Sequence, residues 1–179
     1  MSRIAEMYAE GLYSLAKEEG LTKEIGDQMK VLAQSFAEEP DFVKLLSAAT
    51  ISKQERLEII DGSFRGKVQP YVLNFIKILT EKGYIHHFSD CAAAFTKRYN
   101  EDHNILNVKV TTAVPMDAKQ QEALKVKMEK MTGKTVELSC RVDPAILGGV
   151  RLDYEGKRVD GTVQSRLDTI GGLLENTVL

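Results

Sequence analysis

The sequence is poor in several residue types, and each shortage excludes a class of protein. Its two cysteines are too few for a disulfide scaffold or a four-cysteine zinc site, and it has no tryptophan. Only 4 of its 179 residues are proline, which favours a helix-rich chain. Lysine and arginine number 24 against 26 acidic residues, so the net charge of -2 lacks the basic excess typical of nucleic-acid-binding proteins.

Long apolar runs are also missing. No stretch approaches the ~18 uncharged apolar residues that a membrane-spanning helix needs. The opening residues Met1–Glu6 have neither the apolar core of a signal peptide nor the arginine-rich pattern of a transit peptide. Hydrophobic residues still make up 43% of the chain, enough for a real core. We therefore expect a folded protein that faces the cytosol and does not insert into a membrane.

The first hundred residues have an apolar period typical of helices. Six such segments follow one another, separated by glycine, proline or a capping residue, and they begin near Ser2, Thr22, Pro40, Ser52, Pro70 and Phe88. The fifth segment, Tyr71–Lys82, is apolar nearly all round. Such a helix either lies at the centre of a bundle or has a second face for a partner. The pattern predicts a compact six-helix bundle.

The pattern changes at the polar run Asn100–Asn104. Alternating residues in Leu106–Thr112 and Val136–Val142 predict two strands, with a helix capped by Asp117 between them. A hairpin is expected around Glu155–Gly156. A final helix is expected to carry the apolar residues Val163, Leu167, Ile170 and Leu174. The predicted fold is thus mostly α, with a bundle over residues 1–104 and a small α/β domain (β-α-β-β-α) over 105–179.

Glycine-rich nucleotide motifs are incomplete in this chain. Gly133-Lys134-Thr135 resembles the end of a phosphate-binding loop, but the required first glycine falls on Met128. Gly133 also ends a helix and precedes a strand, which is the reverse of the required order, so we interpret it as a helix C-cap. Gly148-Gly149 lacks the dinucleotide pattern and predicts a turn with positive φ. No cofactor is expected.

Two other groups of residues suggest chemistry weakly. His86, His87 and Cys91 offer two metal ligands at helical spacing, but a third ligand at motif spacing is missing. Asp143, Asp153 and Asp160 are candidate acids or bases without a partner nucleophile or histidine. Pattern analysis alone therefore predicts a two-part, helix-rich interaction protein without a catalytic or metal site.

Several sequence blocks resemble a known family. The block Tyr8–Ala16 is similar to the opening helix of the delta subunit of F-type ATP synthase, called the oligomycin-sensitivity-conferring protein in mitochondria. More specific are Val142–Leu152, Asp160–Val163 and Arg166–Leu167, at their spacing near the C-terminus. The match Asn74–Leu79 falls where the family has its fifth helix. The resemblance runs essentially from end to end.

This resemblance implies a non-catalytic stator subunit of the proton-translocating F-type ATP synthase. It implies that the bundle binds the N-terminal helix of an alpha subunit on the α3β3 head, and that the C-terminal domain binds the b subunits of the peripheral stalk. Linking head to stalk in this way supports coupling of proton transport to ATP synthesis. The expected location is the cytoplasmic face of the cell membrane, as a peripheral component.

Carried over to this chain, the resemblance points to particular residues. The alpha-subunit contact falls on the first and fifth helices, at Tyr8, Gly11, Leu12, Leu15, Phe75, Ile76 and Leu79. The family motif near the C-terminus supplies Asp143, Pro144, Gly148, Gly149, Asp160 and Arg166. The same helical stripes are equally well interpreted as bundle core. One departure is Gly83-Tyr84, where the family often has an arginine.

Two other functions remain open from the sequence. One is a helical adaptor of an unrelated complex, and the other is a small cytosolic hydrolase that uses Asp143 or Asp160. Co-purification of alpha, beta and b subunits separates the stator role from both.

The purified chain is predicted to be monomeric and to hydrolyse no nucleotide, because its phosphate-binding motif is incomplete. The measurement is phosphate release from ATP by wild type and by Lys134→Ala. Both rates should equal the protein-free background. A wild-type activity that disappears in Lys134→Ala would show that a nucleotide site exists.

Overall fold

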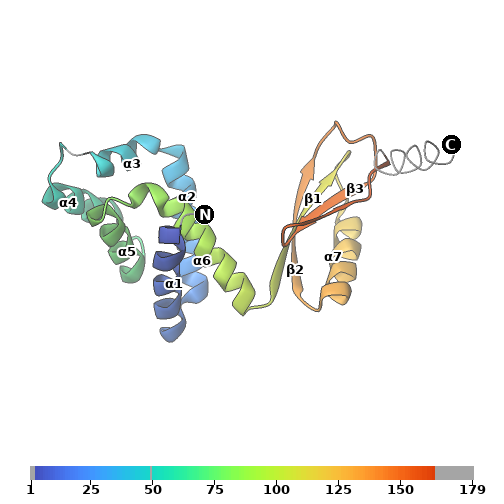
Figure 1. Ribbon diagram of the computed structural model, residues 1–179, viewed down its shortest axis with the longest axis horizontal. Helices are drawn as coiled ribbons and strands as arrows, with labels where there is room; N and C mark the ends of the chain where they lie inside the picture. Colours follow the sequence, from blue (N-terminus) through green and yellow to red (C-terminus); the bar gives the residue numbers. More distant parts are fainter. Residues whose placement is uncertain (1–2, 49, 164–179) are drawn as a thin grey trace, which may run out of the picture. The chain divides into compact units, whose positions relative to one another are not determined.

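The computed structural model describes residues 3–48 and 50–163. The chain divides into two compact units, Met1–Asp102 and His103–Leu179 (Figure 1). The first unit is helical, and the described part of the second is a four-stranded sheet with one helix. This confirms the expected mostly α fold class. The final predicted helix, with Leu167, Ile170 and Leu174, lies outside the described residues, as does the predicted capping residue Ser2.

The described residues of the first unit, 3–48 and 50–102, form six α-helices and one short 3-10 helix. They are α1 (Arg3–Glu18), α2 (Thr22–Glu38), α3 (Pro40–Ser47), α4 (Lys53–Phe64), α5 (Pro70–Glu81), η1 (Ile85–His87) and α6 (Phe88–Asp102). Proline at the first position opens α3 and α5, where its missing N–H costs nothing. The predicted capping box of α4 is confirmed, because the Ser52 hydroxyl accepts from Glu55 N at 3.2 Å and Ser52 N donates to the Glu55 carboxylate at 3.0 Å.

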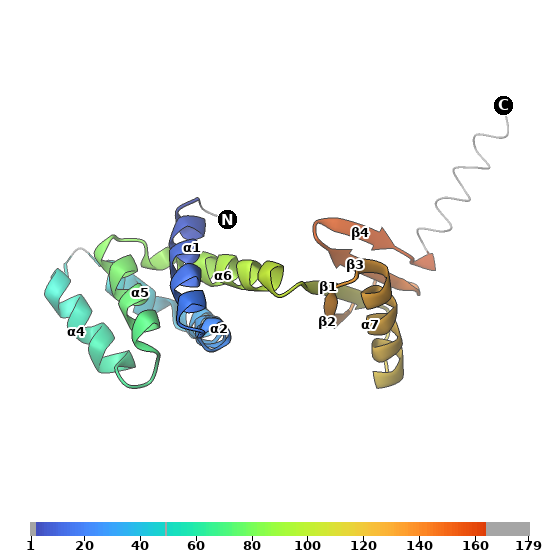
Figure 2. The same cartoon turned by 90° about the horizontal axis from the view of Figure 1, so that it is seen from below.

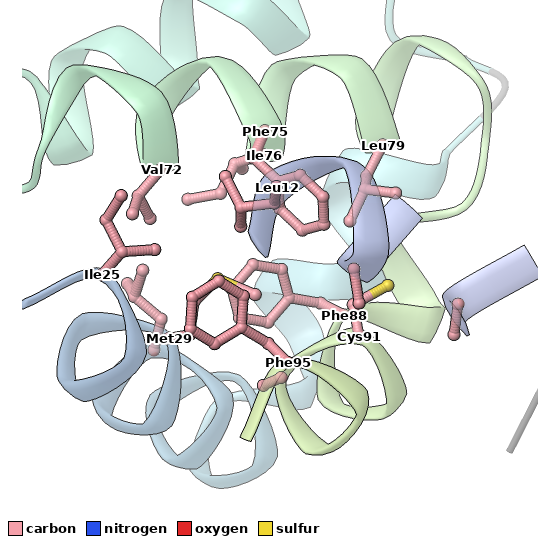
Figure 3. Close-up of a cluster of buried hydrophobic side chains, with 14 of the residues drawn as sticks. Leu12, Ile25, Met29, Val72, Phe75, Ile76, Leu79, Phe88, Cys91 and Phe95 are labelled. Carbon is pink, nitrogen blue, oxygen red and sulfur yellow. The ribbon is translucent and has the colours of Figure 1, made fainter. Parts of the chain in front are cut away.

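The core of this unit is formed where α1, α2, α5 and α6 meet (Figure 3). Aromatic rings fill its centre, with the Phe36 and Phe88 ring centroids 4.9 Å apart and those of Tyr13 and Phe95 5.2 Å apart. A Cβ at Gly26 would lie 3.3 Å from the Phe95 ring, so this glycine lets α2 approach α6 closely. Interlocked rings of this kind stabilise one arrangement of the helices over its alternatives.

The last helix of the unit is longer than its apolar pattern indicates. The apolar pattern changes at Asn100, but α6 continues through the polar residues to Asp102. A carboxylate at a helix C-terminus is unfavourable by itself, because the helix dipole is negative there. Asp102 is stabilised by the Tyr13 hydroxyl, which donates to Oδ2 at 2.9 Å, and by Lys17 Nζ, 2.7 Å from Oδ1. These two contacts with α1 therefore stabilise the polar residues at the C-terminal end of α6.

The second unit combines β1 (Ile105–Thr112), α7 (Ala118–Thr132), β2 (Thr135–Val142), β3 (Val150–Tyr154) and β4 (Lys157–Asp160). The strand order is β2-β1-β3-β4, with β1 and β2 parallel and the other pairs antiparallel. α7 connects the parallel pair and lies along one face of the sheet (Figure 2). The predicted β-α-β-β order is thus present, and Glu155 and Gly156 form the hairpin turn with positive φ.

The caps of α7 also agree with the sequence. The Asp117 carboxylate accepts from Gln120 N at 2.7 Å, and Asp117 N donates to the side-chain Oε1 of Gln120 at 3.1 Å. Gly133 is the left-handed C-cap of α7, with φ 67°. The apolar side chains between α7 and the sheet form the core of this unit: Leu106, Val108, Val110, Met128, Val136 and Leu152.

Removing the Tyr13 hydroxyl should destabilise the first unit in a pH-dependent way. Burial and the hydrogen bond to Asp102 raise the pKa of Tyr13 from 10.0 to about 12. The stabilisation is therefore complete below pH 10 and is lost as the pH rises through about 12. Tyr13→Phe should lower the free energy of unfolding by about 1–2 kcal/mol near neutral pH. Above pH 10 its deficit against wild type should shrink.

Urea unfolding of both proteins at neutral and alkaline pH measures this difference. Tyr8→Phe is the control, since it removes the equivalent hydroxyl from the same helix. A Tyr13→Phe deficit that stays constant up to pH 12 would contradict the assigned role of the hydrogen bond.

Candidate binding surfaces

Most of the expected contact residues on α1 and α5 lie in the bundle core. Leu12 and Phe75 are each 5% exposed, and Ile76 and Leu79 are fully buried. Figure 3 shows all four turned into the same cluster of apolar side chains. They are therefore not free to contact a partner in this conformation. The apolar stripes of the two helices did not decide whether these side chains lie in the core or at an interface. The structure places them in the core.

The other expected residues lie at the surface. Tyr8 and Leu15 are half-buried, and Gly11 is exposed. Positions 8, 11 and 15 are spaced by three and four residues, so they share one face of α1. A Cβ at Gly11 would meet no atom within 4 Å. The α1 helix therefore presents two half-buried side chains, Tyr8 and Leu15, on either side of open space at Gly11.

Two contacts run between α1 and the two ends of α5. The Tyr8 ring lies 6.1 Å from the ring of Tyr84, which follows α5. At the other end, Glu19 follows α1, and its charge together with a hydrogen bond raises the pKa of the Tyr71 phenol at the start of α5. Each end of α5 thus meets the opposite end of α1, which requires the two helices to run antiparallel.

The α5 helix also exposes an apolar residue on the side that carries Tyr71. Ile78 is 45% exposed and lies two helical turns after Tyr71, on the same side of the helix. We call the exposed and half-buried residues of these two helices the α1/α5 surface. They are Tyr8, Gly11 and Leu15 of α1 and Tyr71 and Ile78 of α5. The sequence prediction missed Tyr71 and Ile78. The all-round apolar character of the fifth helix was the signal for a second face, but it did not identify which residues form it.

The C-terminal motif brings two separate segments of the second unit together. Gly161 N donates to the Val150 carbonyl at 2.9 Å, and Val163 N donates to the Gly148 carbonyl at 3.0 Å. Gly149 has φ 90°, and a Cβ there would lie 2.5 Å from the Gly161 carbonyl oxygen. The motif glycine thus permits close contact between two backbones. The predicted positive-φ turn is present at Gly149.

The motif carboxylates stabilise turns. Asp143 Oδ1 accepts from Ala145 N at 3.0 Å, and Asp160 Oδ1 accepts from the Thr162 hydroxyl at 2.7 Å and from Thr162 N at 3.0 Å. The bonds from Thr162 hold the pKa of Asp160 below its ordinary value. A lowered pKa at Asp160 is the opposite of what a general acid needs near neutral pH. Pro144 is exposed in the turn after Asp143. Arg166 lies outside the described residues.

The other residues that the sequence suggested for a nucleotide, metal or catalytic site form ion pairs or are buried. The Lys134 ammonium pairs with the Glu155 carboxylate beside the Gly133 cap. His87 Nδ1 lies 3.7 Å from Asp90 Oδ2, and burial raises the pKa of the Cys91 thiol to about 11. Asp153 pairs with Arg158 Nε at 2.6 Å.

Within 3–48 and 50–163, no three His, Cys, Asp or Glu side chains gather closely enough to hold a metal ion. The helices in the same part of the chain are too short or too polar to cross a membrane.

Comparison with known proteins extends the sequence resemblance. Residues 4–174 match the family model described as the ATP synthase delta (OSCP) subunit. The ATP synthase subunit delta of Alkaliphilus oremlandii is 31% identical over 167 residues, which is 93% of each chain. That of Clostridioides difficile is 31% identical over 176 residues, 98% of this chain and 97% of the relative.

A solved structure shows the same fold. One chain of the Toxoplasma gondii mitochondrial ATP synthase hexamer matches with a TM-score of 0.75 at 18% identity, covering 97% of this chain and 98% of that one. The helical bundle followed by a small α/β unit is thus a fold that this chain shares with a chain of a larger enzyme complex. The chain belongs to the ATP synthase delta (OSCP) subunit family.

Alanine at Gly149 should strongly destabilise the second unit. Its Cβ would overlap the Gly161 carbonyl in a backbone conformation that already disfavours side chains. We expect a loss of about 3 kcal/mol or more. Gly156→Ala is the matched control, since Gly156 has φ 73° but open space, and it should lose only about 1–2 kcal/mol.

Urea unfolding of the two variants, with the wild type alongside, measures both losses. Equal losses would show that the backbone contact at Gly149 contributes nothing beyond the positive φ.

Proposed function

We propose that this chain is the non-catalytic stator subunit that links the α3β3 head to the b subunits of the peripheral stalk. Such a link holds the head against rotation and so supports the coupling of proton transport to ATP synthesis. The proposed location is the cytoplasmic face of the cell membrane. Family membership and the division into two units support this role, since a link needs two places of attachment.

The α1/α5 surface is the observation on which the head contact depends. The proposed partner is the amphipathic N-terminal helix of an alpha subunit. Helices of this kind bind by placing an apolar face against apolar side chains of the receptor. Leu15 and Ile78 provide apolar contact area, while the Tyr8 ring is apolar and its hydroxyl stays hydrated at the rim. The open space at Gly11 lets the backbone of a bound helix approach closely.

The buried residues of the same helices have a supporting role in this proposal. Leu12, Phe75, Ile76 and Leu79 hold α1 and α5 in place from within the core. A preformed surface loses less conformational entropy when it binds, which favours affinity. The b subunits are assigned to the second unit, which contains the family motif.

A carboxylate at Gly11 should weaken the head contact and leave the bundle folded. Gly11→Asp places a charge where the partner helix would remove it from water, without a compensating bond. The expected loss is about 2 kcal/mol or more in binding, which is roughly thirtyfold in Kd. The bundle should survive, because nothing lies within 4 Å of the new Cβ. Titration of a peptide with the sequence of the alpha N-terminus measures the change.

Gly62→Asp is the matched control. Gly62 is also a helical glycine with open space around its Cβ, but it lies on α4. Its variant should bind the peptide like wild type, and melts followed by circular dichroism should show that both variants are folded. If folded Gly11→Asp binds as tightly as Gly62→Asp, the alpha helix does not bind at the α1/α5 surface.

A further inference from the structure

The backbone that joins the two units is short. The first unit ends with α6 at Asp102, and β1 of the second unit begins at Ile105. We call the two residues between them, His103 and Asn104, the connector. Asn104 is already tied to the second unit, because its carbonyl accepts from Thr135 N at the start of β2 at 3.0 Å. The length of the connector therefore depends on where α6 ends.

The last turn of α6 is polar and has little intrinsic preference for a helix. Tyr99 is the last apolar residue of α6, and Asn100, Glu101 and Asp102 follow it. Carboxylates near the C-terminus of a helix are disfavoured by the helix dipole. Glu101 is compensated within α6 by Arg98, whose Nη1 lies 3.6 Å from Oε2. A compensating contact for Asp102 comes from another helix, α1.

The contact from α1 holds both oxygens of the Asp102 carboxylate. The Tyr13 hydroxyl donates to Oδ2 at 2.9 Å, and Lys17 Nζ lies 2.7 Å from Oδ1. Tyr13 is buried with its ring 5.2 Å from that of Phe95, so its hydroxyl is held in place by the core. The Lys17 side chain is 60% exposed, so its ion pair is weakened by salt. We call the contact of Tyr13 and Lys17 with Asp102 the α1 clasp.

We propose that the α1 clasp is a releasable lock that sets the length of the connector. When the clasp is closed, α6 runs to Asp102 and the connector has two residues. When it opens, the three residues Asn100–Asp102 leave the helix and join these two, so the connector has five. Three residues span about 4.5 Å in a helix and up to about 10 Å when extended, so opening adds roughly 5 Å of reach.

The inference rests on the proposed stator function and specifies how the link between head and stalk responds to load. Tension between the two attachments favours the longer connector, because extension in the direction of the force lowers its free energy. The bundle core is not involved in this change. Tyr13 and Lys17 lie roughly 160° around α1 from Leu15, so opening the clasp should leave the α1/α5 surface intact.

Amide hydrogen exchange of the full chain measures the opening of the clasp. Tyr13→Phe and Lys17→Gln each remove one half of it. Each substitution should accelerate exchange at the amides of residues 100–102 at least threefold, and the double variant should do so at least tenfold. Low concentrations of urea should leave the accelerated rates unchanged, because unwinding one turn exposes little surface.

Lys97→Gln is the matched control for Lys17→Gln. Lys97 is an exposed lysine whose Nζ lies 4.0 Å from Glu101 Oε1, but it belongs to α6 itself and not to the clasp. Its variant should exchange at residues 100–102 within twofold of wild type. Equal exchange in wild type and the folded double variant would overturn the proposal. Acceleration that rises steeply with urea would also overturn it, because the clasp would then stabilise the whole bundle.

A pair of dyes tests whether the connector lengthens. Cys140 is exposed on β2 and takes one dye, and Val31→Cys places the other on α2 at a 65% exposed position. Cys91 stays unlabelled, because it is buried and burial raises the pKa of its thiol to about 11. The distribution of dye distances should widen in the double variant. An unchanged distribution would overturn control of the connector by the clasp.

Binding assays on the double variant separate this inference from the proposed function. The double variant should bind the alpha-subunit peptide and the b subunits like wild type. Loss of peptide binding by the folded double variant would overturn the proposal, because the clasp would then shape the α1/α5 surface. A wild-type chain that binds neither the head nor the stalk would refute the proposed function and leave the exchange result unaffected.

Discussion

The packing of α5 into the bundle core is the constraint on which the proposed head contact depends. Val72, Ile76 and Leu79 are fully buried, and each such side chain contributes about 1.5–3 kcal/mol relative to exposure. Their burial fixes the rotation of α5 about its axis. Ile78 is consequently held outward, on the side of α5 that includes Tyr71 and is tied to α1. The proposed binding surface is thus a consequence of how the core is filled.

Much of the fold could be predicted from the sequence, because the local signals agree with the tertiary structure. Capping residues such as Ser52 and Asp117 act within one turn of a helix, and the hairpin at Glu155–Gly156 depends on two adjacent residues. The end of α6 could not be predicted in this way. Asp102 is stabilised by Tyr13, which lies 89 positions earlier in the chain. A local sequence pattern cannot indicate a contact between residues so far apart.

The candidate site was predicted less completely, for a physical reason. A helix that is apolar all round has no polar face to show which side is buried, so Phe75 and Ile78 cannot be distinguished by periodicity. The motif glycines were placed in a turn correctly. The close contact between the backbones at Gly149 and Gly161 joins separate segments, so only the structure shows it.

The central claim is that this chain joins the head to the stalk, and a bridging experiment tests it most directly. The water-soluble segment of the b subunits is immobilised, and capture of purified α3β3 head is measured with and without the chain. The account predicts capture only when the chain is present, and reduced capture with Gly11→Asp but not with Gly62→Asp. Equal capture in the absence of the chain, or a chain that binds the head and never retains it on the b segment, would contradict the account.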